Sequence, residues 1–156
     1  MQCRVNNLKE IMLLGQYESK IGVKHQAGLP KKFREELGDT LIVTKGFENC
    51  LIIVAEENWK TLLEGTEGKP FTSKSTRKLQ RFLLGNASYV DLDEKGRFVV
   101  PEYLRQFARL DTEVVFVGIQ RFVELWDKKS WDEHQLDLSK NIESIAERLS
   151  EEENKE

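Results

Sequence analysis

The sequence predicts an α+β fold, mainly β, in which two copies of one small unit interleave into a single barrel. The first observation is an internal repeat: residues 89–105 read YVDLDEKGRFVVPEYLR, and residues 18–34 read ESKIGVKHQAGLPKKFR. The second is that each copy offers only short apolar strands and short helices, too little to bury both of its faces alone. Because an internal repeat constrains the whole topology, we expect the two copies to share one core.

The repeat extends beyond these two stretches. Moving one copy onto the other by about seventy residues superposes the landmarks of both, with a single insertion after the first helix. The paired residues are Lys24 and Lys95, Pro30 and Pro101, Arg34 and Arg105, Asp39 and Asp111, Gly46 and Gly118, and Trp59 and Trp131. These matches define a first copy, residues 12–64, and a second copy, residues 85–134.

The composition is that of a soluble globular protein, with 39% hydrophobic and 33% charged residues in a chain of 156. No stretch approaches the roughly 18 consecutive apolar residues of a membrane span, and the N-terminus lacks the apolar core of a signal peptide. Cys3 and Cys50 lie far apart without a CxxC motif or a clustered histidine, which argues against a zinc site or a disulfide framework. We therefore expect a cytoplasmic protein with ordinary thiols, no membrane contact, no metal and no cofactor.

The net charge of −3 is unevenly spread along the chain. From Asp132 to Glu156 there are nine acidic residues against three basic ones, a net charge of −6, which leaves +3 on the body. A mildly basic body with a separate acidic tail is compatible with nucleic-acid binding, whereas the whole-chain charge would hide that possibility.

Residues 1–11 show no periodicity, and we expect a flexible extension there. The first copy opens with a strand pattern at 17–23, a turn at 24–26 and a short strand that runs into Pro30. Proline at the first helical position presets φ and gives up an amide that would be unpaired anyway. Residues 31–37 are therefore predicted to form a short helix.

The rest of the first copy predicts a hairpin and a closing helix. The runs at 41–43 and 51–54 are rich in β-branched residues, which is typical of strands. Residues 56–63 have a helical pattern. Residues 65–84 are expected to link the two copies, with a connecting helix over 73–84.

The second copy repeats this plan. Its expected segments are strands at 90–92, 98–100, 114–117 and 122–126, a turn at 93–97 and a helix at 102–108. Asp127 is a good N-cap for a closing helix through Trp131. In the acidic tail, residues 135–156, an apolar stripe predicts an amphipathic helix that packs either on its own body or on a neighbour: Leu138, Ile142, Ile145 and Leu149.

The turn at 93–97, DEKGR, followed by an apolar strand and Pro101, resembles the DxxxR turn of the MraZ family of bacterial transcription regulators, which have an AbrB-like swapped-hairpin fold. The resemblance runs from about Met12 to His134 and includes the opening LLG, both PxxxR helix starts and QRFLL at 80–84. It implies a double-split β-barrel built from both copies and a homo-oligomeric ring. It also implies a nucleoid-associated repressor of the operon of division and cell-wall genes, with DxxxR turns that face short, G-rich direct repeats in double-stranded DNA.

The first copy departs from the family pattern. Gly22 stands where the acid should be, Gln26 stands where the arginine should be, and Ala27-Gly28 replaces two apolar strand residues. An arginine fork binds guanine O6 and N7 together, whereas the glutamine amide suits adenine and carries no charge. The change either weakens binding or alters the preferred base.

The resemblance makes Lys95 and Arg97 the first candidates for DNA contact, with Lys24, His25 and Gln26 as a weaker second set. Turns that need glycine often carry solvated charges without any function, which is the alternative interpretation of the second turn. His25 lacks a second nearby histidine and is an unlikely metal ligand. Gln26 either reads a base or is an uninvolved surface amide.

Three further residues are candidates for supporting roles. Asp93 is expected to orient Arg97 rather than contact DNA, because phosphate repels a carboxylate. Arg34 and Arg105 either contact phosphate or pair with a carboxylate such as Glu18 or Asp93. Trp59, Trp126 and Trp131 are interpreted as core residues rather than base-stacking platforms.

Two functions follow from these observations. The first is a sequence-specific DNA-binding repressor that acts as a ring oligomer. The second is an oligomeric assembly protein of the same fold with weakened or lost DNA binding. An enzyme is not expected, because the sequence offers no group of nucleophile, base and orienting residue, no phosphate-binding glycine loop and no small-molecule site.

Overall fold

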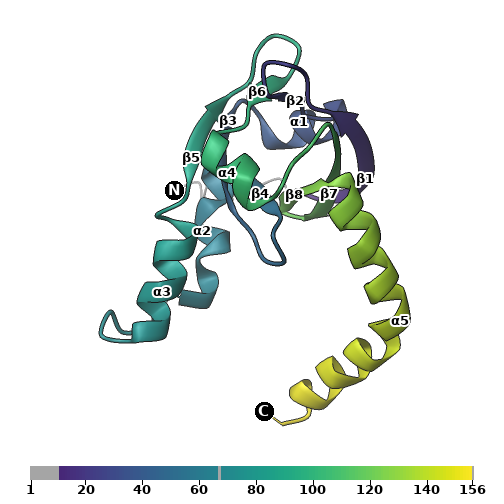
Figure 1. The fold of residues 1–156 in the computed structure, drawn as a ribbon. Helices are drawn as coiled ribbons and strands as arrows, with labels where there is room; N and C mark the ends of the chain where they lie inside the picture. Colours follow the sequence, from purple (N-terminus) through teal and green to yellow (C-terminus); the bar gives the residue numbers. More distant parts are fainter. Residues whose placement is uncertain (1–10, 67, 156) are drawn as a thin grey trace, which may run out of the picture.

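The computed structural model describes residues 11–66 and 68–155. Residues 1–10 of the expected extension, and with them the thiol of Cys3, lie outside this range. Its last residue, Ile11, is half-buried and packs against the core. The strands form one six-stranded antiparallel sheet and a separate two-stranded ribbon (Figure 1). The prediction of a mixed fold made mainly of strands is confirmed.

The six-stranded sheet has the order β1-β7-β8-β4-β3-β5. Its strands are β1 (Leu13–Lys20), β3 (Thr40–Lys45), β4 (Leu51–Ala55), β5 (Ser88–Asp91), β7 (Glu113–Gln120) and β8 (Phe122–Asp127). The first strand of each copy pairs with a strand of the other copy: β1 of the first copy pairs with β7 of the second, and β5 of the second pairs with β3 of the first. The hairpins of the two copies meet where β4 pairs with β8. The two units therefore interleave.

The hydrogen-bonded ladder is open, whereas the sequence led us to expect a barrel. The remaining strands, β2 (Gln26–Gly28) and β6 (Arg97–Val99), pair with each other and form the two-stranded ribbon. They therefore do not bridge β1 and β5, which are the edges of the larger sheet among the residues described.

The short helices begin where proline predicts. Helix α1 (Lys31–Leu37) follows Pro30 and ends at Gly38, whose φ of 80° suits glycine, so the predicted helix is confirmed. Helix α4 (Glu102–Phe107) follows Pro101 and is one residue shorter than expected. The first strand, expected at 17–23, lies instead at Leu13–Lys20, because the residues after it form the turn that leads into β2.

The remaining helices end the first copy, connect the two copies, or begin at the end of the second copy and continue beyond it. They are η1 (Glu56–Asn58), α2 (Trp59–Leu62), η2 (Glu64–Thr66), α3 (Lys74–Leu83) and α5 (Lys128–Glu153). Asp127 caps α5 as predicted, since its Oδ2 accepts a hydrogen bond from the Ser130 amide. The closing helix and the acidic tail form one continuous helix that extends away from the sheet (Figure 1).

One main core joins both copies. It takes buried residues from α1, α4 and most of the strands, including Phe33, Phe98, Leu104 and Phe116. Trp126 and Trp131 are buried in a second cluster, as expected, whereas Trp59 is only half-buried. Within residues 11–66 and 68–155, no helix is both long enough and apolar enough to cross a membrane.

Candidate nucleic-acid interface

The ribbon of β2 and β6 brings the two predicted turns to one end of the molecule (Figure 1). Its register pairs Gln26 with Val99, Ala27 with Phe98 and Gly28 with Arg97. The central pair, Ala27 and Phe98, is buried in the core. Because side chains alternate along a strand, the outer face of the ribbon carries the other four residues.

The second turn, residues 93–97, is held by its own side chains. The Arg97 and Lys95 amides both donate to Asp93 Oδ1 at 2.9 Å, and Arg97 Nε donates to Asp93 Oδ2 at 2.9 Å. The hydrogen bond from the Arg97 amide, helped by the Arg97 side chain, lowers the pKa of the Asp93 carboxyl. The Arg97 side chain remains 46% exposed. Asp93 thus contacts both the main chain of the turn and Nε of Arg97.

The first turn, residues 22–26, has the same backbone without those side-chain contacts. The His25 amide donates to the Gly22 carbonyl at 3.0 Å, as the Gly96 amide does to the Asp93 carbonyl at 2.9 Å. His25 has a φ of 58°, close to the 76° of Gly96. Gly22 has no carboxylate with which to hold the turn.

The predicted residues of the first turn lie at the surface. Lys24 and His25 are exposed, and Gln26 is half-buried on the outer face of the ribbon. The ribbon therefore brings together both candidate sets, Lys24, His25 and Gln26 with Lys95 and Arg97. Their role in DNA contact stays a prediction.

Each turn is also bonded to the other copy. The Leu29 amide donates to the Gly96 carbonyl at 2.9 Å, and the Val100 amide donates to the His25 carbonyl at 3.1 Å. Arg34 of the first copy covers the second turn so closely that a Cβ on Gly96 would lie 2.8 Å from its Cζ.

Arg105 occupies the equivalent place beside the first turn. It lines a shallow groove with His25, Glu102 and Arg109, and its Nε is buried without a hydrogen-bond partner among the described residues. The groove carries both a carboxylate and a second guanidinium.

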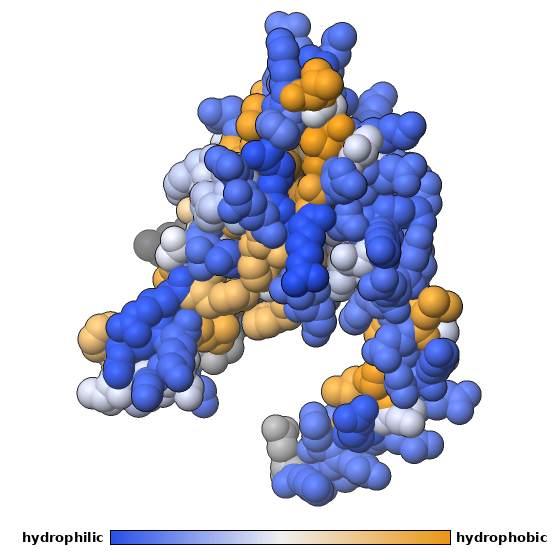
Figure 2. Space-filling model, in the orientation of Figure 1, coloured by the Kyte–Doolittle hydropathy of each residue, from blue (hydrophilic) through white to orange (hydrophobic). Residues whose placement is uncertain are grey.

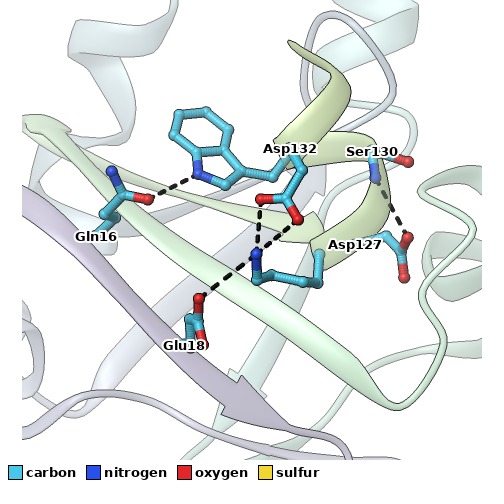
Figure 3. A network of polar contacts seen from close by, with 7 residues as sticks. Gln16, Glu18, Asp127, Ser130 and Asp132 are labelled. Carbon is cyan, nitrogen blue, oxygen red and sulfur yellow. Dashed lines mark hydrogen bonds and ion pairs between the residues drawn. The ribbon is translucent and has the colours of Figure 1, made fainter. Parts of the chain in front are cut away.

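Carboxylate pairing, one of the two alternatives for Arg34 and Arg105, is absent from the ion pairs of the described residues, and the two example carboxylates lie beside other cations. Asp93 pairs with Arg97, and Glu18 lies 3.5 Å from Lys128 Nζ. Lys128 also contacts Asp132 at 2.6 Å (Figure 3).

Figure 3 shows how the start of α5 is attached to β1. Trp131 Nε1 donates to Gln16 Oε1 at 2.8 Å, beside the pair between Lys128 and Glu18. Cys50 packs in the same cluster as Trp131, where burial raises the pKa of its thiol and keeps it protonated. No group of His, Cys, Asp and Glu in the described residues could hold a metal ion.

Sequence reasoning missed two exposed apolar residues at this end of the molecule. Val23, at the tip of the first turn, is 97% exposed, and Val99, beside Gln26, is 55% exposed. Figure 2 shows apolar atoms among hydrophilic side chains at this end. The available signal was an apolar residue at a turn position where the second copy has Glu94.

Comparison with known proteins agrees with this repeat. Two consecutive segments, residues 12–82 and 83–152, match the family described as "MraZ protein, putative antitoxin-like". The chain is 39% identical to the transcriptional regulator MraZ of Caldanaerobacter subterraneus subsp. tengcongensis over 138 residues, 88% of this chain and 96% of the relative. It is also 39% identical to the protein of the same name from Thermoanaerobacter pseudethanolicus over 140 residues, 90% and 98% of the two chains. The chain therefore belongs to the MraZ family.

Proposed function

We propose that this chain is a sequence-specific DNA-binding transcription regulator that contacts DNA with the two turns of the ribbon. The observation that carries the proposal is the arrangement at Arg97. Its Nε is engaged by Asp93, while the side chain stays 46% exposed, so both terminal nitrogens can be presented as a fork. Such a fork binds guanine O6 and N7 together in the major groove.

The comparisons support the regulatory part of this proposal. The relatives from Caldanaerobacter and Thermoanaerobacter are named transcriptional regulators and match nearly their whole length. As a finer proposal, the chain is a nucleoid-associated repressor of the operon of division and cell-wall genes. Lys95 and Arg97 would provide its main contacts, and Lys24, His25 and Gln26 a second set.

The proposal includes a ring of several copies bound to short direct repeats. The body has a net charge of only +3, so one copy has few cations with which to attract phosphate. Several turns on successive repeats would raise the apparent affinity through effective concentration. We also propose that the open sheet and the ribbon together correspond to a double-split β-barrel, and the exchange of β1 and β5 supports this.

Fluorescence anisotropy tests the function directly. The duplex would carry the DNA upstream of the gene that encodes the chain, and a scrambled duplex of equal composition would be the control. Binding is expected to favour the upstream duplex and to weaken linearly in log salt, by about 0.9 log units per phosphate contact and per log unit of salt. Equal binding to both duplexes would contradict the proposal.

Two observations favour a second function. The first turn lacks both the acid and the arginine, and α5 exposes Ile142 and Leu149 on the predicted stripe. These features fit an oligomeric assembly protein that has lost tight DNA binding. In that case the chain would form an oligomer but would not distinguish the two duplexes.

A further inference from the structure

The first turn differs from the second in chemistry rather than in shape. Val23 is 97% exposed at its tip, where the second turn has Glu94. An apolar side chain this exposed loses nothing by contact with another apolar group, and burying it is favourable. The position therefore offers an apolar contact to whatever lies against the turn.

Exposed apolar surface also lies beside Gln26. Gln26 lies on the outer face of the ribbon, and its cross-strand partner Val99 is 55% exposed. The main chain of Gln26 is bonded to Gly22 and paired with Val99, but its side-chain amide makes no hydrogen bond with another residue in 11–66 and 68–155. Its donor and acceptor thus remain available beside apolar surface.

The net charge of the first turn is no less favourable for DNA than that of the second turn. Residues 22–26 contain Lys24 and no carboxylate, a formal charge of +1, with His25 neutral. Residues 93–97 contain Asp93, Glu94, Lys95 and Arg97, a formal charge of zero. A phosphate backbone is therefore not repelled from the first turn. Although this turn lacks the arginine, its net charge is more positive than that of the second turn, because it also lacks the two carboxylates.

We propose that Gln26 and Val23 read an A·T base pair, so that each protomer carries two turns of different base specificity. This inference rests on the proposed DNA-binding function. Glutamine pairs with adenine N6 and N7, and a small apolar side chain contacts the thymine methyl group, and both groups are displayed in the major groove. The second turn reads guanine through Arg97.

The ribbon fixes the spacing of the two specificities. Gln26 pairs with Val99, and Arg97 lies two residues earlier on the same strand, so Gln26 and Arg97 are diagonal neighbours. Such neighbours are about 7–8 Å apart across a sheet, and stacked bases repeat about every 3.4 Å. The A·T pair is thus expected about two base pairs from the guanine.

Selection from a random duplex library with the full chain tests this inference. The wild type is expected to select a motif with a guanine and, about two base pairs away, an A·T pair. Gln26→Ala should keep the guanine and lose the A·T preference, a discrimination of about 5- to 150-fold. Gln26→Arg should shift that position to G·C.

Replacing the thymine of that pair by uracil removes only its methyl group. Wild-type affinity should fall about fourfold, the contribution of one buried methylene, and Val23→Ala should show no further loss on uracil. Leu136→Ala, which removes an apolar group that is 64% exposed on α5, is the matched control and should behave as the wild type.

The outcomes separate the two claims. If the wild type selects no motif, DNA reading itself fails, and this inference falls with it. If the wild type selects a motif that Gln26→Ala and Val23→Ala also select unchanged, the regulator stands and the A·T reading is overturned. A loss in Gln26→Ala that is equal for all four base pairs would likewise overturn it.

Discussion

The turns at 22–26 and 93–97 have matching backbone hydrogen bonds and left-handed residues at matching positions, yet only the second has side chains that hold it. In the second, Asp93 accepts three hydrogen bonds, two from amides and one from Arg97 Nε. In the first, the backbone and the pairing with the other copy are sufficient. Backbone pairing thus sets the shape of both turns, and the side chains decide what each turn can bind.

The largest difference lies beneath the turns, where Ala27 faces Phe98 in the core. Phe98→Ala should lower the free energy of unfolding by about 3–5 kcal/mol, because it removes a buried aromatic ring. Urea unfolding at a fixed protein concentration, followed by tryptophan fluorescence, measures this. Ala27→Phe combined with Phe98→Ala should recover part of the loss. A cost below about 1 kcal/mol would show that the ribbon does not depend on this pair.

The next effect concerns the fork of the second turn. Arg97→Lys keeps the charge but loses the planar pair of donors, so affinity for the preferred duplex should fall by about 1–3 kcal/mol. Arg81→Lys, on an exposed position of α3, is the control and should leave binding unchanged. Equal affinities of Arg97→Lys and wild type in anisotropy would mean that charge alone matters at this position.

The left-handed positions should respond in opposite directions. Gly96→Ala puts a Cβ at φ 76° and 2.8 Å from Arg34 Cζ, so it should destabilise the fold by about 1–2 kcal/mol. His25→Gly relieves the same backbone conformation and should stabilise by up to about 1 kcal/mol. Thermal unfolding compares the two. Equal signs would indicate that the two backbones are not equivalent.

The smallest effect is the pH dependence of the second turn. Because the folded pKa of Asp93 is lowered, the contacts of its carboxylate stabilise the fold above the ordinary pKa of about 3.9 and are lost as the pH falls through the folded value. An NMR titration of the Asp93 carboxyl measures the midpoint. Arg97→Ala should raise it only in part, because the amide of residue 97 still donates. A midpoint at or above the ordinary value would contradict the contacts.

Local sequence signals predicted most of the helices and strands of the fold. Pro30 and Gly38 defined α1 without tertiary information, because proline and glycine act on the backbone itself. The strand borders were less secure: β1 begins at Leu13 because it pairs along its whole length with β7, a hundred residues away. The position of β1 at the edge of the sheet could not be predicted either, because it depends on β2 pairing with β6 rather than with a strand of the larger sheet.

The site was predictable where the motif is complete. Asp93 and Arg97 are four residues apart, and their contact is local, so the sequence alone indicated it. The position of Arg34 over Gly96 and the exposure of Val23 depend on how the two copies interleave. These relations join different repeats, and a pattern within one repeat does not contain them.

The most direct test of the difference between the turns is a binding cycle on one duplex. Wild type and Arg97→Ala would each be titrated with the selected motif, once with guanine and once with 7-deazaguanine, which lacks the N7 acceptor. If Arg97 reads this guanine, deletion of N7 should weaken wild-type binding about tenfold or more, the contribution of one charged hydrogen bond, and leave Arg97→Ala unchanged. Equal losses in both proteins would show that Arg97 does not contact the base, and would contradict the assignment of the second turn as the guanine reader.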